Sequence, residues 1–211
     1  MMIKKIVLFF VFSTVLSCQT EKTPLQAVQH YQYKQNLAFG TQESSILTSE
    51  DFKNFNGLQF FPIDLNFQVQ AVFTAIHDAP VFEIPTTTGR KPLYKKYGLL
   101  TFELNRIKHQ LYLYQNQDKD RDPAYKDYLF LPFTDESNGE QTYGGGRFID
   151  LYTTDITAEN TVTIDFNKAY NPYCAYNPKY SCPIVPEENH LAIAVTAGVK
   201  DFKNSEKPTK D

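Results

Sequence analysis

Tryptophan is absent from this chain of 211 residues, and cysteine and histidine are scarce, with three and four copies. The large rings of any core must therefore come from the 17 phenylalanines and 14 tyrosines. Lys and Arg form no cluster, and the formal net charge is only -3, which argues against a nucleic-acid partner. With 42% apolar and 21% charged residues, the composition is that of an ordinary globular protein.

Several motifs of enzymes and metal proteins are also missing. There is no Gly-x-Ser-x-Gly, which disfavours a serine hydrolase of the usual α/β kind. Gly144–Gly146 is followed by neither Lys-Ser/Thr nor a helical pattern, as a phosphate-binding loop would require. Asp118–Asp122 alternates carboxylates, but Pro123 and Leu129 stand where a calcium loop needs Gly and Glu. The histidines form no HxxxH or HxH pair, so we predict neither a metal nor a cofactor.

The N-terminus has the layout of a secretory signal, with two early lysines before an apolar run that ends at Leu16. This run is too short for a typical membrane span. Val15–Cys18 resembles a bacterial lipobox, whose cysteine is acylated and becomes the new N-terminus. We therefore predict an exported protein, lipid-anchored in the bacterial cell envelope through Cys18, with a signal peptide over 1–17 and a tether over 18–23. The alternative is an ordinary signal peptide with an incidental cysteine.

The remaining chain is mostly short segments of alternating apolar and polar residues. Apolar spacing predicts a helix over 24–40, and Thr48 begins a second helical turn. Alternation predicts strands over 63–73, 81–84, 100–104, 111–113, 128–133, 148–151, 161–167 and 191–195, with a short polar loop over 105–109 that makes a hairpin. We predict a mainly β domain over 24–203, an antiparallel sandwich or barrel-like sheet with an N-terminal helix and a long structured C-terminal loop, followed by a flexible tail over 204–211.

The candidate chemistry gathers in residues 143–189, where Gly, Pro, Asn, Tyr and Cys crowd together as in a specified irregular loop. Arg147, beside bare glycine backbone, can hold a carboxylate or phosphate bidentately, or lock Asp150 or Asp165 internally. Asp165 and Asn167 share the polar face of a strand. They either line a cavity, with Asp165 as base, acid or metal ligand, or fix the turn that follows.

A second carboxylate and several rings accompany these residues. Glu188 is the best partner of Asp165 for acid–base work, although the sequence gives no distance between them. Tyrosine rings suit stacking on a sugar, or else simply cover a loop without regular structure. The tyrosines of this stretch are Tyr143, Tyr170, Tyr173, Tyr176 and Tyr180.

Cys174 and Cys182 are the cysteines that remain after lipidation. In an exported protein they are expected to form a disulfide, which would contribute roughly 2–3 kcal/mol by constraining the unfolded chain. Zinc binding, or a nucleophilic Cys174 with His190, stay open as alternatives.

Together these motifs resemble the bacterial family known as domain of unknown function 1684. The resemblance covers most of the mature chain, from Phe55–Pro62 to the last strand, and it departs at Val199, where the family usually has Glu. It implies no established activity. The residues that carry it are Phe133-Thr134, Asn138-Gly139, Thr142–Arg147, Asp165–Pro172, Cys174–Asn177, Cys182-Pro183, Asn189 and Leu191.

Our leading hypothesis is a domain that binds a small polar ligand, such as a glycan or an anionic metabolite. Arg147 would clamp an anion, and Asp165 would hydrogen-bond the ligand. The other predicted binding residues are Tyr143, Asn167, Tyr170, Asn171, Tyr176 and Asn189. The alternatives are a hydrolase that uses Asp165 with Glu188 or Cys174, and a structural protein that meets another envelope protein.

Overall fold

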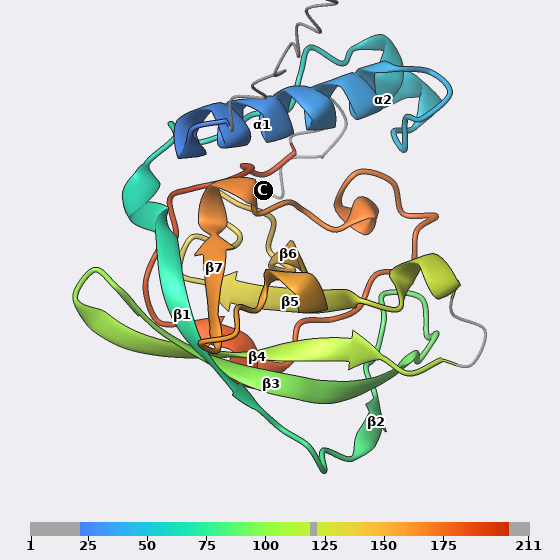
Figure 1. Ribbon diagram of the computed structural model, residues 1–211. Coiled ribbons are helices and arrows are strands. Elements are labelled where there is room, and N and C mark those ends of the chain that lie inside the picture. Colours follow the sequence, from blue (N-terminus) through green and yellow to red (C-terminus); the bar gives the residue numbers. More distant parts are fainter. Residues whose placement is uncertain (1–21, 119–121, 203–211) are drawn as a thin grey trace, which may run out of the picture.

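The computed structural model describes residues 22–118 and 122–202, so the predicted signal peptide, Cys18 and the tail over 204–211 lie outside the described residues. The predicted mainly β class is confirmed. One curled, half-barrel sheet carries eight strands, and helix α1 (Pro24–Gly40) lies across one end of it (Figure 1). A second helix, α2 (Ser49–Lys53), follows α1.

The strands follow the predicted alternation in most places. Along the sheet their order is β6-β5-β4-β3-β1-β7, with β2 paired to β3 and β8 to β5; β5 and β8 run parallel and the other pairs are antiparallel. The strands are β1 (Gln68–Ala75), β2 (Val81–Glu83), β3 (Leu93–Leu104), β4 (Ile107–Asn116), β5 (Tyr128–Asp135), β6 (Arg147–Tyr152), β7 (Thr161–Asp165) and β8 (His190–Leu191).

Local chemistry explains how the long elements begin and turn. Thr23 and Gln26 form a capping box at the start of α1, and Pro24 occupies the first helical turn, where its missing N–H costs nothing. Asn105 and Arg106 both have positive φ, which gives the tight hairpin turn between β3 and β4 the twist that paired strands require.

Apolar side chains pack into three clusters. The main core lies against one face of the sheet and includes Leu129, Leu131, Ile149 and Leu151 from β5 and β6. A second cluster lies on the opposite face of those strands and includes Phe130 and Phe148. The third cluster holds α1 in place, and in it the rings of Phe39 and Tyr176 meet edge to face with centroids 4.7 Å apart.

The predicted strand over 191–195 is wrong beyond Leu191. Val195 donates its N–H to Asp135, and the carbonyls of Val195 and Ala197 accept from Arg147. Residues 192 and 193 form a bend, and from Val195 onward side chains satisfy backbone groups that a neighbouring strand would otherwise bond.

Candidate functional site

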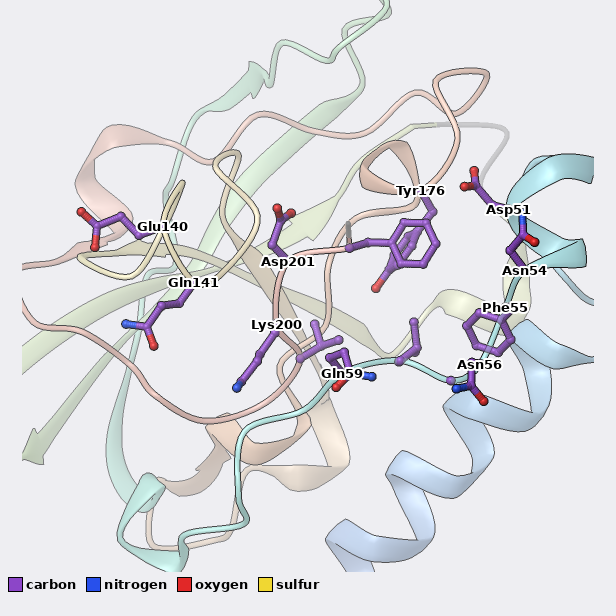
Figure 2. Close-up of a pocket in the computed structure, with 14 residues that line it drawn as sticks. Asp51, Asn54, Phe55, Asn56, Gln59, Glu140, Gln141, Tyr176, Lys200 and Asp201 are labelled. Carbon is purple, nitrogen blue, oxygen red and sulfur yellow. The ribbon is translucent and has the colours of Figure 1, made fainter. Parts of the chain in front are cut away.

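A cavity of about 580 Å³ lies between the segment after α2 and the C-terminal segment, with the 140–141 turn on one side (Figure 2). Two of its polar side chains take part in contacts that stabilise the fold. Asp51 accepts a hydrogen bond from the hydroxyl of Thr48 at the start of α2, and Tyr176 is only 2% exposed because it packs beneath α1. These two side chains therefore serve the packing of α1 and α2.

A second cavity of about 400 Å³, which we call the tyrosine cavity, has a different character. Strands β5 and β6 supply its floor, α1 supplies Gln35, and the loop after β7 supplies its far wall. Asp150 is its one charged lining residue. The others are Gln35, Tyr94, Tyr125, Tyr128, Phe130, Phe148, Tyr152, Tyr170, Pro172, Tyr173, Tyr180, Ser181, Cys182 and Pro183.

Asp150 owes its position to the alternation of β6. Ile149 and Leu151 point into the main core, so Asp150 faces the opposite side, where it lies across from Phe130 of β5. Its Oδ1 accepts hydrogen bonds from the hydroxyls of Tyr128, at 2.8 Å, and Tyr170, at 2.5 Å. Its Oδ2 accepts none from the part of the chain that the structure describes. One carboxylate oxygen is therefore held in place and the other is available.

The environment of Asp150 makes its charged form less favourable than it is in water. The carboxyl is open to solvent through the cavity, yet desolvation by the surrounding rings raises its pKa, and the bonds from Tyr170 and Tyr128 only partly oppose this. Burial and the charge on Asp150 in turn raise the pKa of both tyrosines. The phenols thus stay protonated and donate. A cationic ligand would stabilise the charged carboxylate and so offset the free energy that its desolvation costs.

A smaller cavity of about 300 Å³ adjoins the tyrosine cavity and shares Asp150 with it. Tyr31 of α1 lines it, and the charge of Asp150 adds to burial in raising the pKa of Tyr31. Asp165 also lines it, with its Oδ2 3.3 Å from the ammonium of Lys168. Asp155 is its third carboxylate, so negative charge exceeds positive charge there.

Arg147 lies elsewhere, in the interior. Its side chain is 0% exposed, and it donates to Asp135 at 2.8 Å and to the carbonyls of Val195 and Ala197. Asp135 is equally buried and also accepts from the backbone and hydroxyl of Ser137. The anion clamp expected of Arg147 has no support in this geometry, because its guanidinium presents no face to a cavity.

The glycines before Arg147 position this pair. Gly146 has φ of +87°, and a Cβ there would come within 2.6 Å of the carbonyl oxygen of Phe133. Gly146 therefore has a backbone conformation that favours glycine, and its backbone lies directly against β5.

The predicted asparagines act as backbone partners. Asn167 accepts from the N–H of Asp64 and donates to its carbonyl and to Asp165, which fixes the turn after β7. Asn171 donates to the carbonyl of Lys200. Asn189 bonds the N–H and carbonyl of Tyr112 and the carbonyl of Pro132, which bridges β4 and β5 where the two strands diverge. These contacts hold segments together and present little to a ligand.

The structure does not bring the proposed catalytic groups together. Asp165 lines the small cavity, whereas Glu188 lines a separate groove beside Ile184–Glu187. Desolvation raises the pKa of Glu188, but its own backbone, Lys96 and Tyr114 lower it by a greater amount. His190 bonds Thr134 and Glu136, so it does not serve as a base for Cys174.

The predicted disulfide is not formed: Cys174 and Cys182 are free thiols in contact, since the N–H of Cys174 lies 3.1 Å from Sγ of Cys182. Tyr143 hydrogen-bonds Cys174 and does not line the tyrosine cavity. Within the described ranges no three His, Cys, Asp or Glu side chains could hold a metal ion, and no helix there is long and apolar enough to cross a membrane.

Sequence analysis singled out Tyr170 and the tyrosine-rich stretch that lines part of this cavity, but it did not connect Asp150 with them. It noted Asp150 only as a partner for Arg147. A usable signal exists in Phe148, Asp150 and Tyr152, because alternate positions on a strand share one face, and here a lone carboxylate stands between two rings. Tyr31 and Gln35 come from a distant helix, and no local pattern connects them to this face.

Comparison with known proteins places the chain in a family without assigned chemistry. No curated protein matches it. An uncharacterised protein of Haloarcula marismortui, whose solution structure was determined by NMR, is 32% identical, with a TM-score of 0.63 over 82% of this chain and 92% of its own. A family model described as "Protein of unknown function (DUF1684)" matches residues 53–200. The chain therefore belongs to the DUF1684 family.

Proposed function

We propose that this protein binds a small polar ligand in the tyrosine cavity, and that the ligand presents a protonated amine or a quaternary ammonium group to Asp150. One observation carries the proposal. Asp150 stands among aromatic rings with one oxygen fixed and the other unbonded, and no Lys or Arg of the described residues pairs with it. A cationic ligand would provide the opposite charge and the hydrogen-bond donor that this carboxylate lacks within the described residues.

The rings support the same ligand. An aromatic face attracts a cation through its quadrupole, by about 0.5–1 kcal/mol when exposed and more when desolvated. Tyr152 and Tyr173 on the rim are partly exposed and present such faces, while Phe148 and Phe130 close the floor. Aromatic faces also stack on the C–H faces of sugars. An amino sugar would use both features, so the glycan of our initial hypothesis remains compatible.

An anionic metabolite fits less well. The guanidinium of Arg147 is buried against Asp135, and the ammonium of Lys168 in the adjoining cavity is paired with Asp165. Arg90 is at the rim, where it donates to Ser181. An anion entering the cavity would meet the charge of Asp150, and no Lys or Arg is among the residues that line the cavity beside it.

Anchoring in the cell envelope is a separate part of the proposal and rests on the lipobox-like Val15–Cys18. A lipid on Cys18 would hold the domain at a membrane surface with the tether over 18–23 as spacer. The test is fractionation of cells that express the full chain, with Cys18→Ser as the comparison. We expect the unsubstituted protein in the membrane fraction and Cys18→Ser in the soluble fraction. Equal distribution of the two would reject the anchor.

Ligand binding is tested with probes that differ in charge but little in size. Glucosamine, glucose and gluconate are cationic, neutral and anionic, and tetramethylammonium supplies a bare cation. Each would be titrated into the full chain, with binding followed by calorimetry and by shifts in NMR spectra. We expect glucosamine and tetramethylammonium to bind, glucose to bind more weakly and gluconate not to bind.

Substitutions test whether glucosamine binds at Asp150. Asp150→Asn should weaken glucosamine at least roughly tenfold, because a hydrogen bond to a charged group contributes about 1.5–3 kcal/mol. Asp78→Asn makes the same change of charge in an exposed turn and should leave affinity unaltered. Tighter binding of gluconate than of glucosamine, or equal glucosamine affinity in the Asp150 and Asp78 variants, would overturn the proposal.

A further inference from the structure

Cys174 and Cys182 form a contact that the tyrosine cavity alone does not explain. Cys174 lies in a short 3-10 turn (Tyr173–Ala175), and a turn at Asn177 brings the chain back so that Cys182 meets it. The N–H of Cys174 donates to Sγ of Cys182 at 3.1 Å. Thr87 holds Cys182 from the other side, through a bond from the Cys182 N–H to its hydroxyl and one from its own N–H to the Cys182 carbonyl.

The surroundings of the two sulfurs differ. The thiol of Cys182 and the hydroxyls of Tyr143 and Thr87 bond to Sγ of Cys174. These donors, with Cys182 first among them, lower the pKa of Cys174 to about 6, despite opposing desolvation. Cys182 is buried, and its role as donor to Cys174 raises its own pKa. Within the pair, the thiolate is therefore favoured on Cys174, and Cys182 is the neighbour that keeps its proton.

We propose that Cys174 and Cys182 are a reversible thiol–disulfide site, in which Cys174 is the attacking thiolate and Cys182 the resolving thiol. The co-reactant is a low-molecular-weight disulfide. Sγ of Cys174 attacks one sulfur of that disulfide, forms a mixed disulfide and releases the first small thiolate. Sγ of Cys182 then attacks Cys174, and its proton passes to the second small thiolate as this leaves. Two protein thiols and one small disulfide become one protein disulfide and two small thiols.

Three features support this order of events. Attack requires a thiolate that a solute can reach, and Cys174 is the more exposed of the two residues. Resolution requires a second thiol beside the first, and the thiol of Cys182 hydrogen-bonds the side chain of Cys174. Metal binding is the competing use of two sulfurs, but within residues 22–118 and 122–202 no third ligand of the usual kinds joins them. The inference is independent of the ligand proposed for Asp150.

The test uses the full chain carrying Cys18→Ser, so that the two thiols under study are the ones present. Alkylation by iodoacetamide would be followed from peptide masses as a function of pH. We expect Cys174 to react first, with a midpoint near pH 6, and Cys182 to be protected. Tyr143→Phe removes one donor and should move the midpoint of Cys174 upward. An unshifted cysteine would instead titrate at about 8.5.

Addition of glutathione disulfide then tests the second step. The protein with both thiols should lose them together as an internal disulfide, and dithiothreitol should restore them. Cys182→Ser should stop at a mixed disulfide with glutathione on Cys174, and Cys174→Ser should give no adduct on Cys182. Earlier reaction of Cys182, a persistent glutathione adduct on the protein with both thiols, or a Cys174 midpoint unchanged by Tyr143→Phe would each overturn the proposal.

Discussion

Two aspartates near the same sheet edge have opposite circumstances. Asp135, at the end of β5, is buried, and both of its oxygens are engaged: Oδ1 by Ser137 and Val195, and Oδ2 by Arg147. Asp150, on β6, is open to a cavity and uses one oxygen, to which two tyrosines donate. A carboxylate whose hydrogen bonds are complete supports the fold, whereas one that is half satisfied and raised in pKa offers a place for a ligand.

The same contrast shows that a conspicuous sequence motif can stabilise the fold and need not mark a binding site. The glycine-rich turn and Arg147 draw attention in the sequence, and they lead into the interior, where they fix the C-terminal segment to β5 and β6. Asp150 sits in an unremarkable strand and faces the cavity. Within the described residues, the strongest local signal therefore marks architecture, and the candidate site lies on the other face of the same strand.

The largest effect on stability should follow from removing the buried ion pair between Asp135 and Arg147. Arg147→Met leaves the carboxylate of Asp135 buried without its cation, and such losses cost about 3–5 kcal/mol. We expect the free energy of unfolding, from urea titration followed by circular dichroism, to fall by that amount. A loss below about 1 kcal/mol would show that the buried pair contributes little and would remove the contrast with Asp150.

Asp150→Asn should act in the opposite direction on stability. Because the folded-state pKa of Asp150 is raised, the folded protein binds more protons between the ordinary pKa near 3.8 and the raised value. Stability of the unsubstituted protein therefore decreases as pH rises through that window, and the decrease persists above it. Asn does not titrate, and its carbonyl can still accept from Tyr128 and Tyr170. The variant should be at least as stable as the unsubstituted protein at neutral pH.

Urea titrations from about pH 3 to pH 8 check this prediction. The stability difference, variant minus unsubstituted protein, should grow with pH and then level off. A variant that unfolds more easily at every pH, as expected for Arg147→Met, would assign Asp150 to the architecture. Gained stability together with lost affinity for glucosamine would instead sharpen the contrast between the two aspartates.

Much of the fold could be predicted because burial imposes a period on the chain. Alternation located most of the strands, and apolar spacing located α1. The strand expected over 191–195 does not form beyond Leu191, and alternation gives no information about the cause. Asp135 and Arg147, more than 40 residues away, take over the backbone groups that a neighbouring strand would have bonded.

The site was harder to predict because it is assembled from segments distant in sequence. Tyr170 was identified from its tyrosine-rich surroundings, but Tyr128 belongs to β5, and Gln35 enters from α1. Asp165 and Glu188, expected as a pair, line separate cavities. Sequence spacing cannot show which face of a strand becomes hollow, since this depends on what packs over it.

Tyr170→Phe is a smaller change than Asp150→Asn, because it removes one of the two hydrogen bonds to Oδ1 of Asp150 and keeps the carboxylate. The variant keeps the ring and removes one donor to Oδ1, so the pKa of Asp150 should rise further. Cation binding needs the carboxylate, and the pH at which glucosamine affinity reaches half its maximum should therefore move upward. Tyr173→Phe is the matched control, because Tyr173 lines the same cavity without bonding Asp150. Equal shifts in both variants would show that the phenol of Tyr170 has no specific effect.

The smallest effect is expected for the ion pair between Lys168 and Asp165, which lies at the edge of the adjoining cavity. The Lys168 side chain is 35% exposed, so solvent screens the pair, and Asp165 keeps bonds from Gln68 and Asn167 when the ammonium is removed. Lys168→Met should therefore lower the free energy of unfolding by less than about 1 kcal/mol. It should also tighten glucosamine slightly, because a positive charge near Asp150 is lost. Weaker glucosamine binding in this variant would mean that Lys168 contacts the ligand, and the charge argument for a cation would then have to be withdrawn.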